Sequence, residues 1–77
     1  MKISIVHELL DFCNDRAMSE NYMLTHATHK TKRTAAQHKE IVACFNLAVR
    51  AGWIIRDKVQ RTRFIRNPKM RAESCNH

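Results

Sequence analysis

The stretch Leu47-Ala-Val-Arg-Ala-Gly-Trp-Ile-Ile-Arg56 marks the point where the chain changes from a helical to an extended pattern. Gly52 is the only glycine among the 77 residues, and glycine is the residue that most often follows the end of a helix. Trp53, Ile54 and Ile55, which come next, are typical of a strand. We therefore expect a long helix before Gly52 and a strand, Trp53–Arg56, directly after it.

The long helix is predicted to span Thr34–Ala51. Thr34 and Gln37 have the spacing of a capping box, in which the two residues bond the free N–H groups of the first turn. Apolar residues recur at helical spacing and should face the core; they are Ile41, Phe45, Ala48 and Gly52, with Val42 and Val49 beside them. The opposite face is polar, with small residues between long ones: Ala36, Lys39, Glu40, Ala43, Asn46 and Arg50.

A second strand is expected after the helix. Asp57-Lys58 is a candidate turn, and Val59–Arg66 is rich in residues that favour strands. Because side chains alternate along a strand, residues 61, 63 and 65 should share one face, which makes Arg61 and Arg63 project together. Phe64 should then pack against the long helix. Asn67-Pro68 ends this strand, so we expect one domain over residues 1–67 and a loose tail over 68–77.

Two shorter helices are expected upstream. Ser4 is a candidate cap for a helix over about Ile5–Asn14, which has a broad apolar face. Ser19 is a candidate cap for a second helix, whose buried side is supplied by Tyr22, Met23, Leu24 and Ala27. The predicted fold is therefore mainly α, with three helices and a small β-hairpin.

The charge of the chain is uneven. Lys and Arg number 14 against seven Asp and Glu, for a net charge of +7. Residues 1–29 carry two basic and four acidic residues, a net of −2, whereas residues 30–77 carry twelve basic and three acidic residues, a net of +9. A strongly basic half indicates a polyanionic partner, most commonly nucleic acid and next an anionic membrane surface. The cations cluster on the predicted hairpin and turn instead of along an amphipathic helix, which disfavours the membrane surface.

Three helices followed by a hairpin, joined through Leu47–Arg56, resemble the winged helix-turn-helix DNA-binding domains, especially the compact ones of phages and mobile elements. The resemblance covers about residues 4–66. It implies a regulator of transcription or of a phage or mobile element, with the helix Thr34–Ala51 in the major groove of double-stranded DNA and the wing Trp53–Arg66 on the backbone. Such regulators often pair, so a homodimer is an open alternative.

The resemblance also implies which residues meet DNA. On the long helix these are Ala36, Lys39, Glu40, Ala43, Asn46 and Arg50, and on the wing Arg56, Lys58, Arg61 and Arg63. From their position just before the long helix, Lys30, Lys32 and Arg33 are a candidate phosphate clamp, because the N-terminus of a helix already favours an anion.

Other functions have less support in the sequence. The main alternative is a protein-interaction module of the same fold, acting as an adaptor or as an inhibitor of a host enzyme. A zinc site could be considered from four nitrogen and sulfur ligands, His26, His29, His38 and Cys44. However, there is no Cys-x-x-Cys pair, and His38 and Cys44 lie six residues apart on one helix, which places them on poorly matched faces. We find no paired carboxylates, glycine-rich loop or Ser/His/Asp order, so no enzyme, cofactor or metal is expected.

The chain is expected to work in the cytoplasm, on the nucleoid if bacterial or from a phage. No stretch approaches the about 18 apolar residues of a membrane span, and the first residues do not resemble a secretory signal. Cys13 and Cys44 should be reduced core thiols, and Trp53 a core anchor.

Overall fold

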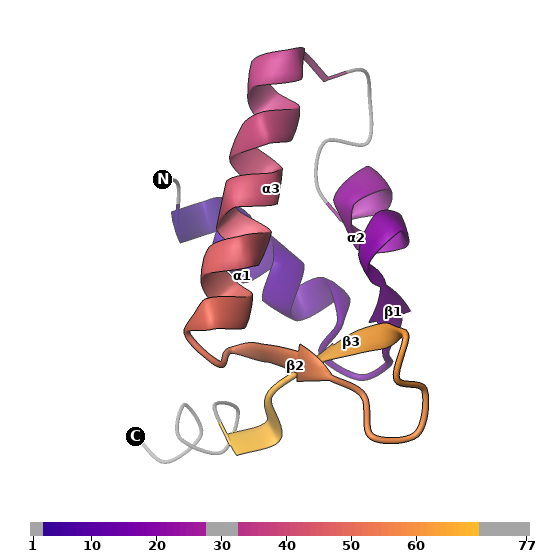
Figure 1. Cartoon of the computed structure of the whole chain (residues 1–77). Helices are drawn as coiled ribbons and strands as arrows, with labels where there is room; N and C mark the ends of the chain where they lie inside the picture. The colour runs from indigo at the N-terminus through magenta and orange to yellow at the C-terminus, as the bar shows by residue number, and fades with distance from the viewer. Residues whose placement is uncertain (1–2, 28–32, 70–77) are drawn as a thin grey trace.

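The computed structural model describes residues 3–27 and 33–69. Within them lie three helices and one small antiparallel sheet of three strands (Figure 1). In chain order the elements are α1 (Ile3–Phe12), β1 (Met18–Ser19), α2 (Glu20–His26), α3 (Ala35–Arg50), β2 (Ile54–Arg56) and β3 (Arg63–Arg66). The fold is mostly helical, and its layout is compatible with a winged helix. No helix in the described parts of the chain has the length and apolar character needed to cross a membrane.

Helix α3 has the ends that its sequence predicts. The Thr34 hydroxyl accepts the Gln37 backbone N–H at 3.1 Å, and the Gln37 side chain accepts the Thr34 N–H at 2.8 Å, which confirms the capping box. At the other end, Gly52 has a φ of +80°, in the left-handed region that favours glycine. The N–H of Gly52 bonds to the carbonyl of Val49, and that of Trp53 to the carbonyl of Ala48. These two bonds form a Schellman motif, which ends the helix.

The core lies between the three helices and the inner face of the sheet. Helix α3 buries the predicted Ile41, Phe45 and Ala48, and α1 buries its apolar face: Ile5, Val6, Leu9 and Leu10. Phe64 on β3 meets Phe45 edge to face, with ring centroids 5.3 Å apart, which confirms the predicted contact of this strand with the long helix. Cys13 and Cys44 are both fully buried as free thiols, as expected, and Trp53 packs against the core while remaining half-buried.

Two predictions about element ends are wrong. Helix α1 starts at Ile3, so Ser4 lies inside its first turn and is not the cap, and the helix ends at Phe12, before Asn14. Trp53 belongs to the turn that ends α3, because its N–H bonds to the carbonyl of Ala48, and strand β2 therefore begins at Ile54. By contrast, Ser19 does cap α2, accepting the Tyr22 N–H at 3.2 Å. Of the residues expected on the buried side of this helix, Met23 is buried and Tyr22 is exposed.

The sheet differs from the predicted hairpin in two ways. First, Met18 and Ser19 form an additional strand that pairs with Phe64 and Arg63, so the strand order is β1-β3-β2 and β3 is central. Second, β3 begins at Arg63 and not at Val59, because residues 57–62 form a loop. The Asp57 carboxylate holds this loop by accepting the backbone N–H groups of Val59 and Gln60, at 3.1 and 2.7 Å.

Candidate nucleic-acid interface

The exposed face of α3 carries one straight polar stripe. Lys39, Ala43, Asn46 and Arg50 follow each other at intervals of four, three and four residues, and all four are exposed. This stripe is offset by two residues from the buried stripe that contains Ile41. Since each residue turns a helix by about 100°, the two stripes lie on opposite sides of α3. Ala36 is also exposed, whereas Glu40, at the margin, is half-buried.

The stripe has the size and chemistry to meet base edges. Lys39 and Arg50 are 11 residues apart in sequence, which spans about 16 Å along a helix at about 1.5 Å per residue. Between them, the small side chain of Ala43 allows another molecule to approach the backbone. Lysine and arginine suit guanine, and asparagine suits adenine. The stripe can therefore donate hydrogen bonds from Lys39 at one end and Arg50 at the other, and Asn46 between them can donate as well as accept.

The scaffold holds this stripe in a fixed position. The capping box fixes the start of α3, the Schellman turn fixes its end, and the buried stripe packs on α1 and the sheet. Side chains that recognise a ligand need such support, because small displacements weaken several contacts at once. The α3 face is therefore supported at both ends and along its buried side.

Arg33 has a structural role that its sequence position does not reveal. Its guanidinium donates to the carbonyls of Leu24, through Nη1, and of Thr25, through Nη2 at 2.7 Å, and Nη1 lies 3.4 Å from Nδ1 of His38. These carbonyls belong to the last turn of α2, whose C-terminal end favours a positive charge. Arg33 thus joins α2 to the start of α3. The other two members of the predicted phosphate clamp, Lys30 and Lys32, lie outside the described residues.

The cations of β2, β3 and the loop between them differ in their contacts with the described residues. Arg56 lies over the ring of Phe64, 4.9 Å from its centroid, and its Nη1 donates to the carbonyl of Arg61 at 2.9 Å. Lys58, Arg61 and Arg63 are exposed. Arg61 lies in the loop before β3, so the strand alternation that predicted a shared face for Arg61 and Arg63 does not apply to it.

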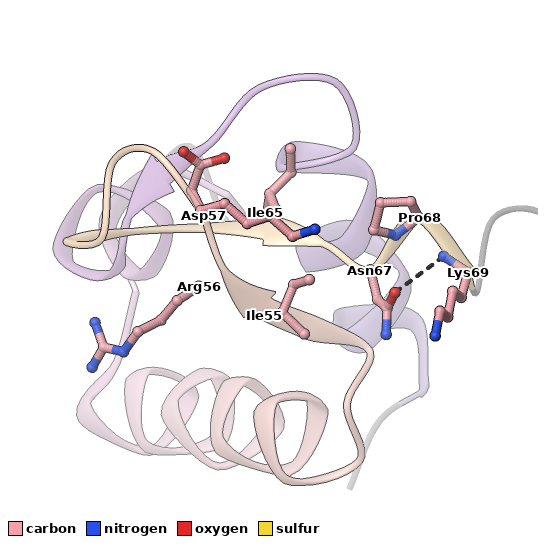
Figure 2. Close-up of a pocket in the computed structure, with 8 residues that line it drawn as sticks. Ile55, Arg56, Asp57, Ile65, Asn67, Pro68 and Lys69 are labelled. Atoms are coloured by element: carbon pink, nitrogen blue, oxygen red, sulfur yellow. Dashed lines mark hydrogen bonds between the residues drawn. The ribbon is translucent and has the colours of Figure 1, made fainter.

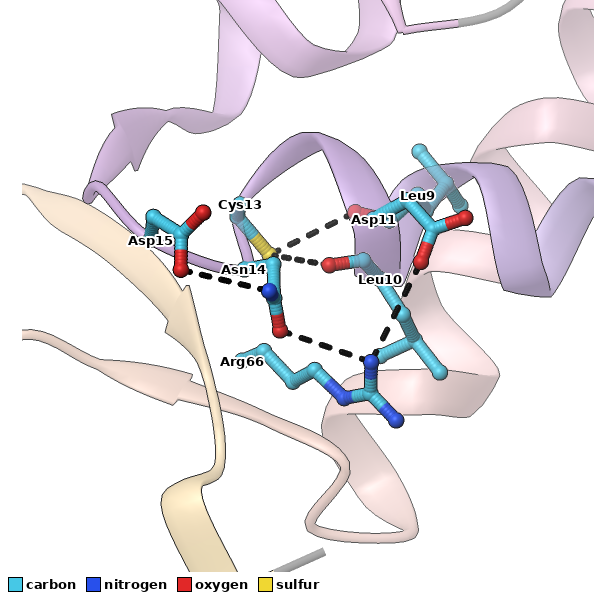
Figure 3. Close-up of polar contacts among 7 residues, drawn as sticks. All are labelled: Leu9, Leu10, Asp11, Cys13, Asn14, Asp15 and Arg66. Atoms are coloured by element: carbon cyan, nitrogen blue, oxygen red, sulfur yellow. Dashed lines mark hydrogen bonds and ion pairs between the residues drawn. The ribbon is translucent and has the colours of Figure 1, made fainter. Parts of the chain in front are cut away.

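Arg66 ties the end of β3 to the end of α1 (Figure 3). Its Nη1 donates to Oδ1 of Asn14 at 3.4 Å and lies 3.9 Å from Oδ1 of Asp11, while its backbone N–H bonds to the carbonyl of Cys13 at 3.0 Å. Its Nε is buried without a hydrogen-bond partner within the described part of the chain. Alternation from Phe64 places residue 66 on the core side, and this signal could have separated Arg66 from the other cations of the strand pair.

Within the described parts of the chain, the thiols and histidines are not brought together into one site. The Cys13 Sγ donates to the carbonyls of Leu9 and Leu10, and burial raises the pKa of this thiol to about 11. His26 packs on Tyr22, with ring centroids 4.5 Å apart, whereas His38 lies beside Arg33. In residues 3–27 and 33–69, no group of three or more His, Cys, Asp and Glu side chains could hold a metal ion. His29 lies outside these residues.

Comparisons with known proteins identified no relative of this chain. A scan against protein-family models, a search of curated proteins and a search of solved structures each found no significant match. Function must therefore be inferred from the chain's own residues.

Proposed function

We propose that this chain is a DNA-binding protein of the winged helix-turn-helix kind, with α3 in the major groove of double-stranded DNA and the loop between β2 and β3 on the phosphate backbone. The observation that carries the proposal is the exposed stripe of α3, in which Lys39, Asn46 and Arg50 lie on one line around the small Ala43. A regulator of transcription, or of a phage or mobile element, is the role that such binding would serve.

The order of elements supports this assignment. Three helices precede an antiparallel pair of strands, and the connecting loop of that pair carries exposed cations. In a helix-turn-helix, the recognition helix enters the major groove while neighbouring elements contact the backbone. Helix α3 is the only helix of the described residues with cations along a straight exposed stripe, which favours it as the recognition helix.

The residues of the proposed interface are expected to have two different roles, contact with phosphates and contact with base edges. Lys58, Arg61 and Arg63 would neutralise phosphates, which positions the protein but carries no sequence information. Lys39, Asn46 and Arg50 would contact base edges, where a good bidentate contact discriminates by about 1–3 kcal/mol. Arg33 and Arg66 are left out of this interface, because their guanidinium groups contact the protein itself.

Binding to duplex DNA at increasing salt tests the proposal. If about four to six phosphates are contacted, the slope of log K against log salt should be about −4 to −5. A fluorescence anisotropy titration with a random-sequence duplex measures this slope. Absence of binding to any duplex at low salt, or a flat response to salt, would refute the proposal.

Substitutions then distinguish residues that recognise bases from residues that contact the phosphate backbone. Arg61→Ala with Arg63→Ala should weaken binding to all sequences and make the salt slope shallower by about two, one for each phosphate contact. Lys39→Ala should relax preference at one base pair of a site selected from a random library. Lys69→Ala is the matched control, because Lys69 is exposed and lies neither on α3 nor in the loop between β2 and β3. If the double variant binds DNA normally, the wing is not a backbone contact.

A further inference from the structure

The sheet has an apolar outer face that the helices do not cover. Ile55 and Ile65 are register partners on β2 and β3, so their side chains point to the same side. Their neighbours Ile54 and Phe64 point to the other side and are buried against the helices, at 1 % and 7 % exposure. Ile55 and Ile65 therefore lie on the side away from the helices, where both are only half-buried (Figure 2).

The residues after β3 form a wall beside these two isoleucines. The Asn67 side chain donates from Nδ2 to the Gly52 carbonyl at 2.7 Å, and its Oδ1 accepts the Lys69 N–H at 3.0 Å. The Asn67 N–H bonds to the carbonyl of Trp53. Together these bonds hold Pro68 next to the strands (Figure 2). The result is a preformed pocket with an apolar floor.

Two lysines lie at opposite ends of this pocket. Lys58 follows β2 and Lys69 follows shortly after β3, and because the strands are antiparallel, these positions are at opposite ends of the pair. Both lysines are exposed, and no acidic side chain of the described residues pairs with either. The Asp57 carboxylate also lines the pocket beside Lys58, where it accepts two N–H groups of the loop, and Arg56 adds a second cation at this end. The pocket is therefore apolar in its centre and positively charged at both ends.

We propose that this pocket, defined by Ile55, Lys58, Ile65, Pro68 and Lys69, binds an acidic segment of a partner protein. One large apolar side chain of that segment packs on the two isoleucines and Pro68, and Asp or Glu residues on either side of it meet the two lysines. The recognition residues of the proposed DNA interface lie on α3, and the pocket shares only Lys58 with the proposed backbone contact. This interaction makes the chain an adaptor between DNA and an acidic protein.

Other occupants fit the pocket less well. A DNA backbone offers phosphates but no apolar group for the isoleucine floor. A second copy of this chain, paired face to face through a two-fold axis, would bring the lysines of the two copies together, and like charges repel. The chain's own residues 70–77 contain one Arg and one Glu and thus offer no net negative charge.

The test starts from a library of random twelve-residue peptides displayed on phage and selected against the full chain. We expect enrichment of peptides in which Asp or Glu residues flank a large apolar residue. A synthetic copy of an enriched peptide should shift the amide resonances of Ile55, Ile65 and Lys69. Failure to enrich acidic peptides would overturn the proposal.

Variants then locate the binding site. Lys69→Glu should weaken the peptide about five- to tenfold, since it turns an attraction into a repulsion, and Ile65→Thr should weaken it further. Lys69→Glu changes an exposed side chain, so it carries the test even if Ile65→Thr fails to fold. Arg16→Glu and Ile3→Thr are matched controls, exposed and away from the pocket, and should leave peptide affinity unchanged.

Three outcomes would assign the pocket to another occupant and overturn the proposal. A dimer in sedimentation that Ile65→Thr dissociates would identify a second copy. Shifts of the Ile55 and Ile65 amides on removal of residues 70–77 would identify the chain's own end. Loss of DNA affinity in Lys69→Glu, with peptide affinity unchanged, would identify nucleic acid.

Discussion

Replacement of Arg33 tests whether this residue acts within the fold or on a ligand. Its guanidinium donates to two carbonyls of the last turn of α2, and both bonds are lost in Arg33→Met. Hydrogen bonds to charged groups contribute about 1.5–3 kcal/mol when buried. Because Arg33 is only half-buried, we expect about 1 kcal/mol for each bond, or about 2 kcal/mol in total. For a domain of this size, that lowers Tm by about 8–16 °C.

Arg33→Lys refines the same test, because it keeps the charge and removes the planar fork that serves both carbonyls. We expect it to lose about half of the stabilisation, whereas Arg16→Met, at an exposed position, should leave Tm within about 2 °C. Thermal unfolding followed by circular dichroism measures all three variants.

DNA binding provides the second readout. If the guanidinium is occupied by α2, Arg33→Lys and Arg33→Met should leave the salt slope of duplex binding unchanged at temperatures where both are folded. The opposite pattern would refute this reasoning: an unchanged Tm in Arg33→Met, together with a salt slope shallower by about one, would mean that Arg33 contacts a phosphate.

Three further predictions concern single residues. Gly52→Ala should cost about 1–2 kcal/mol from backbone strain alone, because φ is +80° and a Cβ would meet nothing within 4 Å; Gly52→Asn should cost less in the same urea titration. Thr34→Ala should cost about 1 kcal/mol through loss of the α3 cap, and Thr34→Ser should restore most of it. Since burial raises the pKa of the Cys13 thiol from 9.0 to about 11, the folded state favours the protonated form. This stabilisation, on the order of 2–3 kcal/mol, is complete below pH 9 and is lost as pH rises to about 11. Cys13→Ala should abolish that alkaline dependence, and a dependence retained in this variant would contradict the assignment.

The part of the fold that could be predicted from sequence is the part with local signals. The caps of α3 depend on Thr34, Gln37 and Gly52, whose effects act within one turn of the chain. Spacing alone also predicted Ile41, Phe45 and Ala48 on the core face of α3 and the exposed stripe on the other side, whereas Val49, expected beside the core face, is exposed. The same alternation rule placed Phe64 correctly on the core side of β3.

The features that escaped prediction depend on contacts between distant residues. Strand β1 has two residues, too few for an alternating pattern, and it exists because Met18 and Ser19 pair with Phe64 and Arg63. The roles of Arg33 and Arg66 depend on carbonyl and amide groups far along the chain. A count of basic residues treats all of these cations alike, whereas in the fold the guanidinium groups of Arg33 and Arg66 already donate to other groups of the protein.

The position of β3 in the middle of the sheet also has a consequence during synthesis. The strand made last, Arg63–Arg66, is the one that both β1 and β2 require as a partner, so neither earlier strand can pair before it is made. At about 5–20 residues per second, a ribosome completes these final pairing residues several seconds after it starts the chain. Until then the core between α1 and α3 lacks Phe64, the ring that packs on Phe45. The nascent chain should therefore expose the apolar faces of its helices, and complete its fold in one late step once β3 has emerged.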